Sequence, residues 1–79
     1  MIQYSKQAVK AINGMDKPTK QRIKTAIDAI PNGDIKPLKG LPGSYRLRVG
    51  DWRIIFYHID SNTVLIEQIS PRGDVYKRI

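Results

Sequence analysis

Hydrophobic residues recur along this chain with two different spacings. Before residue 31 they lie three or four positions apart, which is the spacing of helices with one buried side. From residue 44 onward they alternate with polar residues, which is the spacing of strands with one buried face. The pattern predicts a single α+β domain over residues 1–79, with an N-terminal αα-hairpin packed on one face of a small antiparallel β-sheet.

The first predicted helix begins after Ser5, a suitable N-cap residue, and runs to about Asn13. Residues 1–4 before it could form a short strand. Gly14 supplies a C-terminal stop. The apolar positions of the helix form one stripe: Ala8, Ala11, Ile12 and Met15.

The second predicted helix opens at Asp16, with Pro18 in its first turn, and runs over about residues 17–30. Its apolar stripe consists of Ile23, Ala26, Ile27 and Ile30. Because the connection between the helices is short, we expect an antiparallel αα-hairpin that covers the sheet. A DNA-binding helix-turn-helix is the alternative, but the flanking surfaces carry lysines and few side chains that read bases.

Two prolines and two glycines predict a loop over residues 34–43, and a β-hairpin follows it. Gly50-Asp51 is a favoured two-residue hairpin turn, which pairs Arg48 with Arg53. Alternation then divides the hairpin into two unlike faces. The core face carries Tyr45, Leu47, Val49, Trp52, Ile54 and Phe56, and the other face carries Arg46, Arg48 and Arg53, with Ile55 and Tyr57 beyond them.

Facing arginines are a cost to folding, because like charges directly opposite on a sheet destabilise it. An anionic partner would offset that cost, and guanidinium is well shaped to bind phosphate through two hydrogen bonds. The alternative is a solvated face whose arginines only keep the sheet soluble. We interpret Arg46, Arg48 and Arg53 as a candidate phosphate-binding site.

A second hairpin is predicted from a turn at residues 60–62 and a strand over residues 63–70. Its register stays open. A two-residue loop places Ile66, Gln68 and Ser70 on the arginine face, whereas a three-residue loop places Leu65, Glu67 and Ile69 there. His58 falls by parity on the core side, as an edge histidine rather than a catalyst.

The net charge of +7 points to nucleic acid or another acidic partner. Seven of the eight lysines precede residue 44, and five of the six arginines follow it, so the arginines are the concentrated group. Lys36, Lys39 and Lys77 are further candidate RNA contacts. With no cysteine and one histidine, no metal site is expected, and no cofactor is implied. No signal peptide or membrane span is evident, so a cytoplasmic protein is expected.

Three short motifs carry a resemblance to a known family: LKG at 38–40, YRLRVGDWRIIF at 45–56 and PRGDVY at 71–76. Together with the order of the predicted elements, they make the chain similar to the RelE/ParE family of toxins from toxin–antitoxin pairs. The resemblance implies either a ribosome-dependent endoribonuclease that cuts mRNA, as in the RelE type, or an inhibitor of DNA gyrase, as in the ParE type. It also implies a cognate antitoxin as partner.

Carried over from the RelE type, the catalytic positions fall on Arg46, Arg48, Arg53, Arg72 and Tyr76. The resemblance thus converges on the arginine face. The best-known RelE pattern has lysines at the first two of these positions, and arginine cannot act as a base. Tyr76 is then the best proton-transfer or base-stacking candidate. Cleavage of mRNA is the leading hypothesis, with gyrase inhibition or a non-catalytic nucleic-acid-binding module as alternatives.

Overall fold

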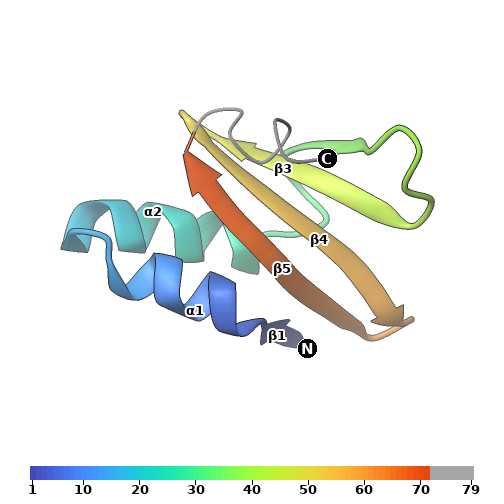
Figure 1. Cartoon of the computed structure of the whole chain (residues 1–79), viewed down its shortest axis with the longest axis horizontal. Helices are drawn as coiled ribbons and strands as arrows, with labels where there is room; N and C mark the ends of the chain where they lie inside the picture. Colours follow the sequence, from blue (N-terminus) through green and yellow to red (C-terminus); the bar gives the residue numbers. More distant parts are fainter. Residues whose placement is uncertain (72–79) are drawn as a thin grey trace.

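The computed structural model describes residues 1–71 of the chain. Along these residues the elements follow in the order β1 (Ile2–Tyr4), α1 (Lys6–Asn13), α2 (Lys17–Asp28), β2 (Asp34–Pro37), β3 (Ser44–Val49), β4 (Trp52–Asp60) and β5 (Thr63–Pro71). The strands form one sheet in the order β1-β5-β4-β3-β2 (Figure 1). The predicted α+β class is therefore confirmed.

The sheet is mixed rather than antiparallel, which corrects the predicted architecture. β1 pairs in parallel with β5, while the other neighbours are antiparallel. Parallel pairing follows from the chain path, because β1 leads directly into α1, which packs against β5. The Ser5 amide donates to the Ile66 carbonyl at 2.9 Å and continues this ladder. β1 thereby covers part of an edge of β5 that would otherwise be open.

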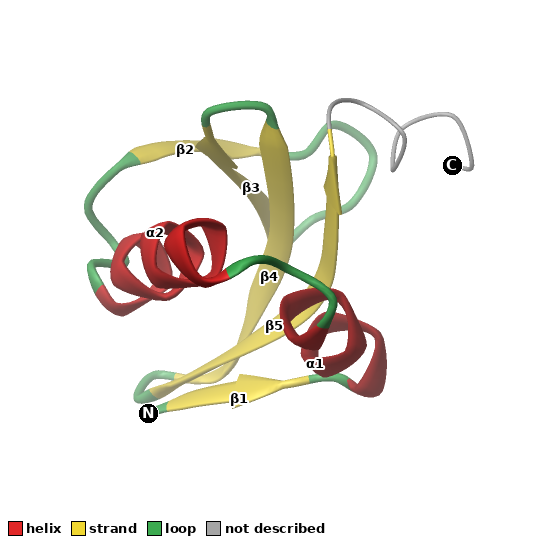
Figure 2. Cartoon of the chain, turned by 90° about the vertical axis from the view of Figure 1, so that its left-hand side faces the viewer, coloured by secondary structure: helices red, strands yellow, loops and turns green. Residues whose placement is uncertain are grey.

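Both helices contribute to one hydrophobic core on the same side of the sheet. α1 packs against β5 and α2 against β3 (Figure 2). Most of the predicted stripes and the predicted core face meet there. The buried cluster consists of Ala8, Ile12, Ile23, Ile27, Leu47, Ile54, Phe56, Ile66 and Ile69. Close antiparallel packing of the two helices on each other stays a prediction.

The helix starts agree with the predicted caps. The Ser5 hydroxyl accepts a hydrogen bond from the Ala8 amide at 3.1 Å and caps α1. α2 begins after Asp16, with proline in its first turn, and ends at Asp28 rather than at the predicted Ile30. The early end has a steric reason, because the residue before Pro31 is disfavoured in helical geometry.

The segment predicted as a loop contains a strand, which is a second correction. β2 pairs with β3, with Asp34 opposite Arg48 and Pro37 opposite Tyr45. β2 is the edge strand of the sheet, and an edge strand tolerates proline because one side of it needs no ladder hydrogen bonds. Only residues 38–43 form the connection to β3.

Two bulges set the register of the second hairpin. The turn has two residues, with Asp60 opposite Thr63, but Ile59 on β4 and Glu67 on β5 have no cross-strand partner. Between the bulges the pairing is shifted by one residue. Each of the two registers left open by the sequence therefore holds over part of β5. Leu65 lies opposite Tyr57, as the three-residue loop predicted, whereas Gln68 and Ser70 lie opposite Ile55 and Arg53, as the two-residue loop predicted.

Candidate anion-binding face

The register of β3 and β4 is the one predicted from the Gly50-Asp51 turn. Val49 pairs with Trp52, and Arg48 lies directly opposite Arg53. Gly50 has a φ of 58°, a conformation that suits glycine in a two-residue hairpin turn. Arg46, Arg48 and Arg53 therefore share the sheet face opposite the core, as the alternation of the strands requires. We call this surface the arginine face.

Neighbouring strands extend the arginine face into two rows across the sheet. The first row, from β2 to β5, is Asp34, Arg48, Arg53 and Ser70. The second row is Lys36, Arg46, Ile55 and Gln68. Lys36, predicted as a loop residue, thus stands beside Arg46 on this face. The rows bring four cations and one carboxylate onto one surface.

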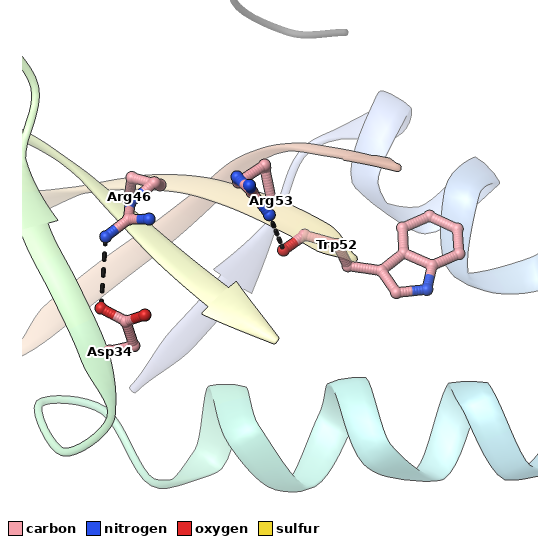
Figure 3. A network of polar contacts seen from close by, with 4 residues as sticks. All are labelled: Asp34, Arg46, Trp52 and Arg53. Carbon is pink, nitrogen blue, oxygen red and sulfur yellow. Dashed lines mark hydrogen bonds and ion pairs between the residues drawn. The ribbon is translucent and has the colours of Figure 1, made fainter. Parts of the chain in front are cut away.

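The carboxylate is held by one of the arginines. The Arg46 guanidinium donates to Asp34 at an Nη2–Oδ1 distance of 3.2 Å (Figure 3). The Arg46 side chain is only 11% exposed, whereas that of Asp34 is 51% exposed. Sequence reasoning missed Asp34 because its segment was assigned to a loop. The alternation of Asp34, Ile35 and Lys36 was the signal that could have placed it on a strand.

The two facing arginines are held less firmly. Arg53 donates from Nη1 to its neighbour's carbonyl, that of Trp52, at 3.5 Å, which is a long contact (Figure 3). Arg48 is exposed and makes no ion pair with any other of residues 1–71. These two guanidinium groups are therefore the ones that an anion could engage without breaking an ion pair.

One apolar side chain, that of Ile55, is buried within the arginine face. Ile55 is 5% exposed, although it lies on the side of the sheet away from the core. Its cross-strand neighbours are Arg46 and Gln68, and Ser70 beyond them is also buried. Charges beside a buried apolar side chain interact more strongly than charges surrounded by water, because the local dielectric constant is lower.

The remaining predicted site residues lie either outside the two rows or outside the described part of the chain. Lys39 is exposed in the connection between β2 and β3, away from the two rows. Arg72, Tyr76 and Lys77 lie outside the described residues. Their proposed roles stay predictions.

His58 is on the core face of the sheet, as its parity predicted. Its ring lies edge-on to those of Tyr45 and Phe56, with centroids 6.0 and 6.3 Å away. Together with Ile30 and Ile35 it lines an apolar hollow of about 240 Å³, which is smaller than a typical small-molecule site. His58 is therefore separated by the sheet from the arginine face.

Comparison with known proteins places this chain in a family. A family model described as "ParE toxin of type II toxin-antitoxin system, parDE" matches residues 2–76. The chain belongs to the RelE/ParE family of toxins. It is thus a toxin of a type II toxin–antitoxin system, as the three motifs predicted.

Individual relatives support this assignment. Toxin RelE3 of Methanocaldococcus jannaschii is 28% identical to this chain over 83 residues, and the match covers 95% of this chain and 93% of the relative. A RelB–RelE antitoxin–toxin complex from Methanococcus jannaschii contains a similar chain, with a TM-score of 0.77, 25% identity and 98% of each chain covered. The archaeal RelE–RelB complex from Pyrococcus horikoshii OT3 has a TM-score of 0.75 at 28% identity, covering 92% of this chain and 94% of that chain.

Two features of the described part of the toxin bear on the remaining expectations. No helix within residues 1–71 is long and apolar enough to cross a membrane. The same residues contain no cluster of three or more side chains of the types that bind metals.

Proposed function

We propose that the toxin inhibits translation by cutting mRNA on the ribosome, and that Arg48 and Arg53 bind the scissile phosphate. The observation that carries this proposal is the direct pairing of these two arginines on an outward sheet face. Two guanidinium groups side by side can donate several hydrogen bonds to one phosphate. Arg72 and Tyr76, which the family resemblance also implicates, would complete the site.

The reaction that fits this face is attack of a ribose 2′-oxygen on the adjacent phosphorus. Negative charge builds on the phosphorus-bound oxygens, and positioned donors stabilise that charge. Loss of one such donor commonly lowers the rate by about 10²–10³, equivalent to roughly 3–4 kcal/mol. Arg46 has a different role in this scheme, because Asp34 already engages its guanidinium. It would supply positive charge to the face from a fixed position.

A second candidate is inhibition of DNA gyrase, which the ParE branch of the resemblance implies. The description of the matching family model favours this candidate. It is also favoured by the chemistry of the face, since arginine can bind an anion but cannot accept a proton. Gyrase inhibition requires binding alone.

A cognate antitoxin is the expected protein partner. Two relatives were solved as RelB–RelE complexes, which supports the same type of assembly for this toxin. The net charge of +7 favours an acidic binding segment. Such a segment would neutralise the arginine face or cover the helices.

Expression in growing cells distinguishes the two candidates. The ribonuclease proposal predicts growth arrest with mRNA cut at codon-spaced positions, and Arg53→Gln should abolish both effects. Lys24→Gln is the matched control, because it removes one exposed positive charge from α2 rather than from the sheet. Growth arrest with intact mRNA and loss of DNA supercoiling would instead establish the gyrase candidate.

A further inference from the structure

One side chain of the arginine face, the Asp34 carboxylate, can accept a proton, whereas the guanidinium groups around it cannot. Asp34 is the only carboxylate among the described residues of the two rows. The other side chains of the rows are four cations, one amide, one hydroxyl and one isoleucine. An ionised carboxylate accepts hydrogen bonds through two oxygens, and one of these, Oδ1, faces Arg46.

The position of Asp34 relative to the facing arginines suits proton transfer. Asp34 lies opposite Arg48, which lies opposite Arg53, so all three side chains stand in one row on the same face. Cross-strand neighbours on one face have Cβ atoms about 4.5–5.5 Å apart. A phosphate held between Arg48 on β3 and Arg53 on β4 would therefore lie about one and a half strand spacings, roughly 7 Å, from the position of Asp34 on β2. A 2′-hydroxyl on the Asp34 side of that phosphate would bridge part of this distance.

From this geometry we infer that Asp34 is the proton acceptor of the cleavage reaction, an inference that rests on the proposed ribonuclease activity. The 2′-hydroxyl gives its proton to the Asp34 carboxylate as its oxygen bonds to phosphorus. The bond from phosphorus to the 5′-oxygen breaks, and the leaving 5′-oxygen takes a proton from solvent. The products are a 2′,3′-cyclic phosphate and a 5′-hydroxyl.

The ion pair with Arg46 gives the carboxylate a defined orientation. Arg46 is largely buried, so its guanidinium is a fixed anchor, while Asp34 is half-exposed and accessible to substrate. The anchor turns one carboxylate oxygen toward the second row. The other oxygen remains for the proton. A role as proton acceptor explains why an acidic residue lies on a face whose other charged side chains are positive.

The variant Asp34→Asn tests whether Asp34 accepts the proton or only neutralises positive charge. Asparagine keeps the shape but cannot take up the proton, so single-turnover cleavage of mRNA in stalled ribosome complexes should slow by about 10²–10⁴. Removal of the negative charge should leave the affinity for a labelled single-stranded RNA unchanged or raise it. Retained RNA binding also shows that the variant is folded. Asp34→Glu, which keeps a carboxylate, should recover part of the rate.

The outcomes divide clearly. If Asp34→Asn cuts mRNA as fast as the wild type, or faster together with tighter RNA binding, Asp34 is a charge neutraliser and the inference is wrong, while the ribonuclease proposal stands. If Asp34→Asn and Asp34→Glu lose RNA binding in parallel with cleavage, Asp34 acts by holding the face together, and the inference is again wrong. A wild-type toxin that leaves translated mRNA intact would refute the ribonuclease proposal and this inference together.

Discussion

Replacement of Arg53 by glutamine should make the toxin more stable and less active. In the first row, Arg53 has a like charge, Arg48, on one side and uncharged Ser70 on the other. Removing its charge therefore relieves a repulsion without breaking an ion pair. Cross-strand repulsions of this kind cost about 0.2–1 kcal/mol, and the free energy of unfolding should rise by that amount.

The same replacement at Arg48 should have a smaller effect on stability. Arg48 lies between Arg53, which repels it, and Asp34, which attracts it. The two interactions have similar magnitudes, so Arg48→Gln should change the free energy of unfolding by less than about 0.5 kcal/mol. Both variants should nevertheless lose cleavage activity by about 10²–10³, because each removes a donor to the phosphate.

Urea denaturation followed by circular dichroism measures the stability difference, with Lys24→Gln as the control for net charge. The gain for Arg53→Gln should shrink in 1 M salt, because the Debye length falls from about 10 Å at 0.1 M to about 3 Å. A variant Arg53→Gln that unfolds at lower urea than the wild type would show that Arg53 supports the fold. The assignment of the facing pair to anion binding would then fail.

Three further predictions test other parts of the structure. Gly50→Ala should destabilise the toxin by about 1–2 kcal/mol because its φ is positive, and by about as much as Gly40→Ala, because the Arg22 guanidinium 2.5 Å from the new Cβ is the far end of a flexible side chain and can move away; no loss in urea denaturation would contradict the positive φ. The pKa of Asp60 lies below its ordinary value of 3.8, mainly because its carboxylate accepts a hydrogen bond from the Asn62 amide. Its contribution to stability is therefore present above pH 3.8 and lost as the pH falls through the lower folded value, so Asp60→Asn should flatten the acid side of the stability profile. An unchanged profile would exclude this turn as a source of acid sensitivity. Association with the antitoxin should slow as salt is added, because charge steering is screened; salt-independent association rates would argue against steering by the basic face.

Local rules were sufficient for the first hairpin and for the helix starts. A two-residue turn at Gly50-Asp51 and strict alternation fix the register of β3 and β4, and with it the position of the arginines. Ser5 is a cap whose identity is visible in the sequence, and the structure uses it as one. These features depend on residues that are close together in the chain.

Features that depend on distant segments could not be predicted in the same way. The bulge at Glu67 coincides with the place where α1 docks, since the Ser5 hydroxyl donates to the Glu67 carbonyl at 2.6 Å. Gln7 similarly exchanges two hydrogen bonds with the Ile69 backbone, at 3.1 and 3.0 Å. These contacts join residues about sixty positions apart, and no local pattern encodes them.

Only part of the candidate site was predicted, again because the rest depends on pairing between distant segments. Alternation placed Arg46, Arg48 and Arg53 together, but Asp34 enters the site only through the pairing of β2 with β3. Short edge strands gain most of their stability from this pairing rather than from their own sequence. Proline and glycine in the segment favoured a loop, and the carboxylate of the face was therefore missed.

The most direct test of the proposed ribonuclease activity is to map the 5′ ends of an mRNA during translation in a purified system. The wild-type toxin should produce new ends at codon-spaced positions, none when ribosomes are omitted, and Arg53→Gln should produce few or none. Intact mRNA in the presence of folded wild-type toxin would contradict the proposed activity, and cuts in naked RNA would contradict dependence on the ribosome.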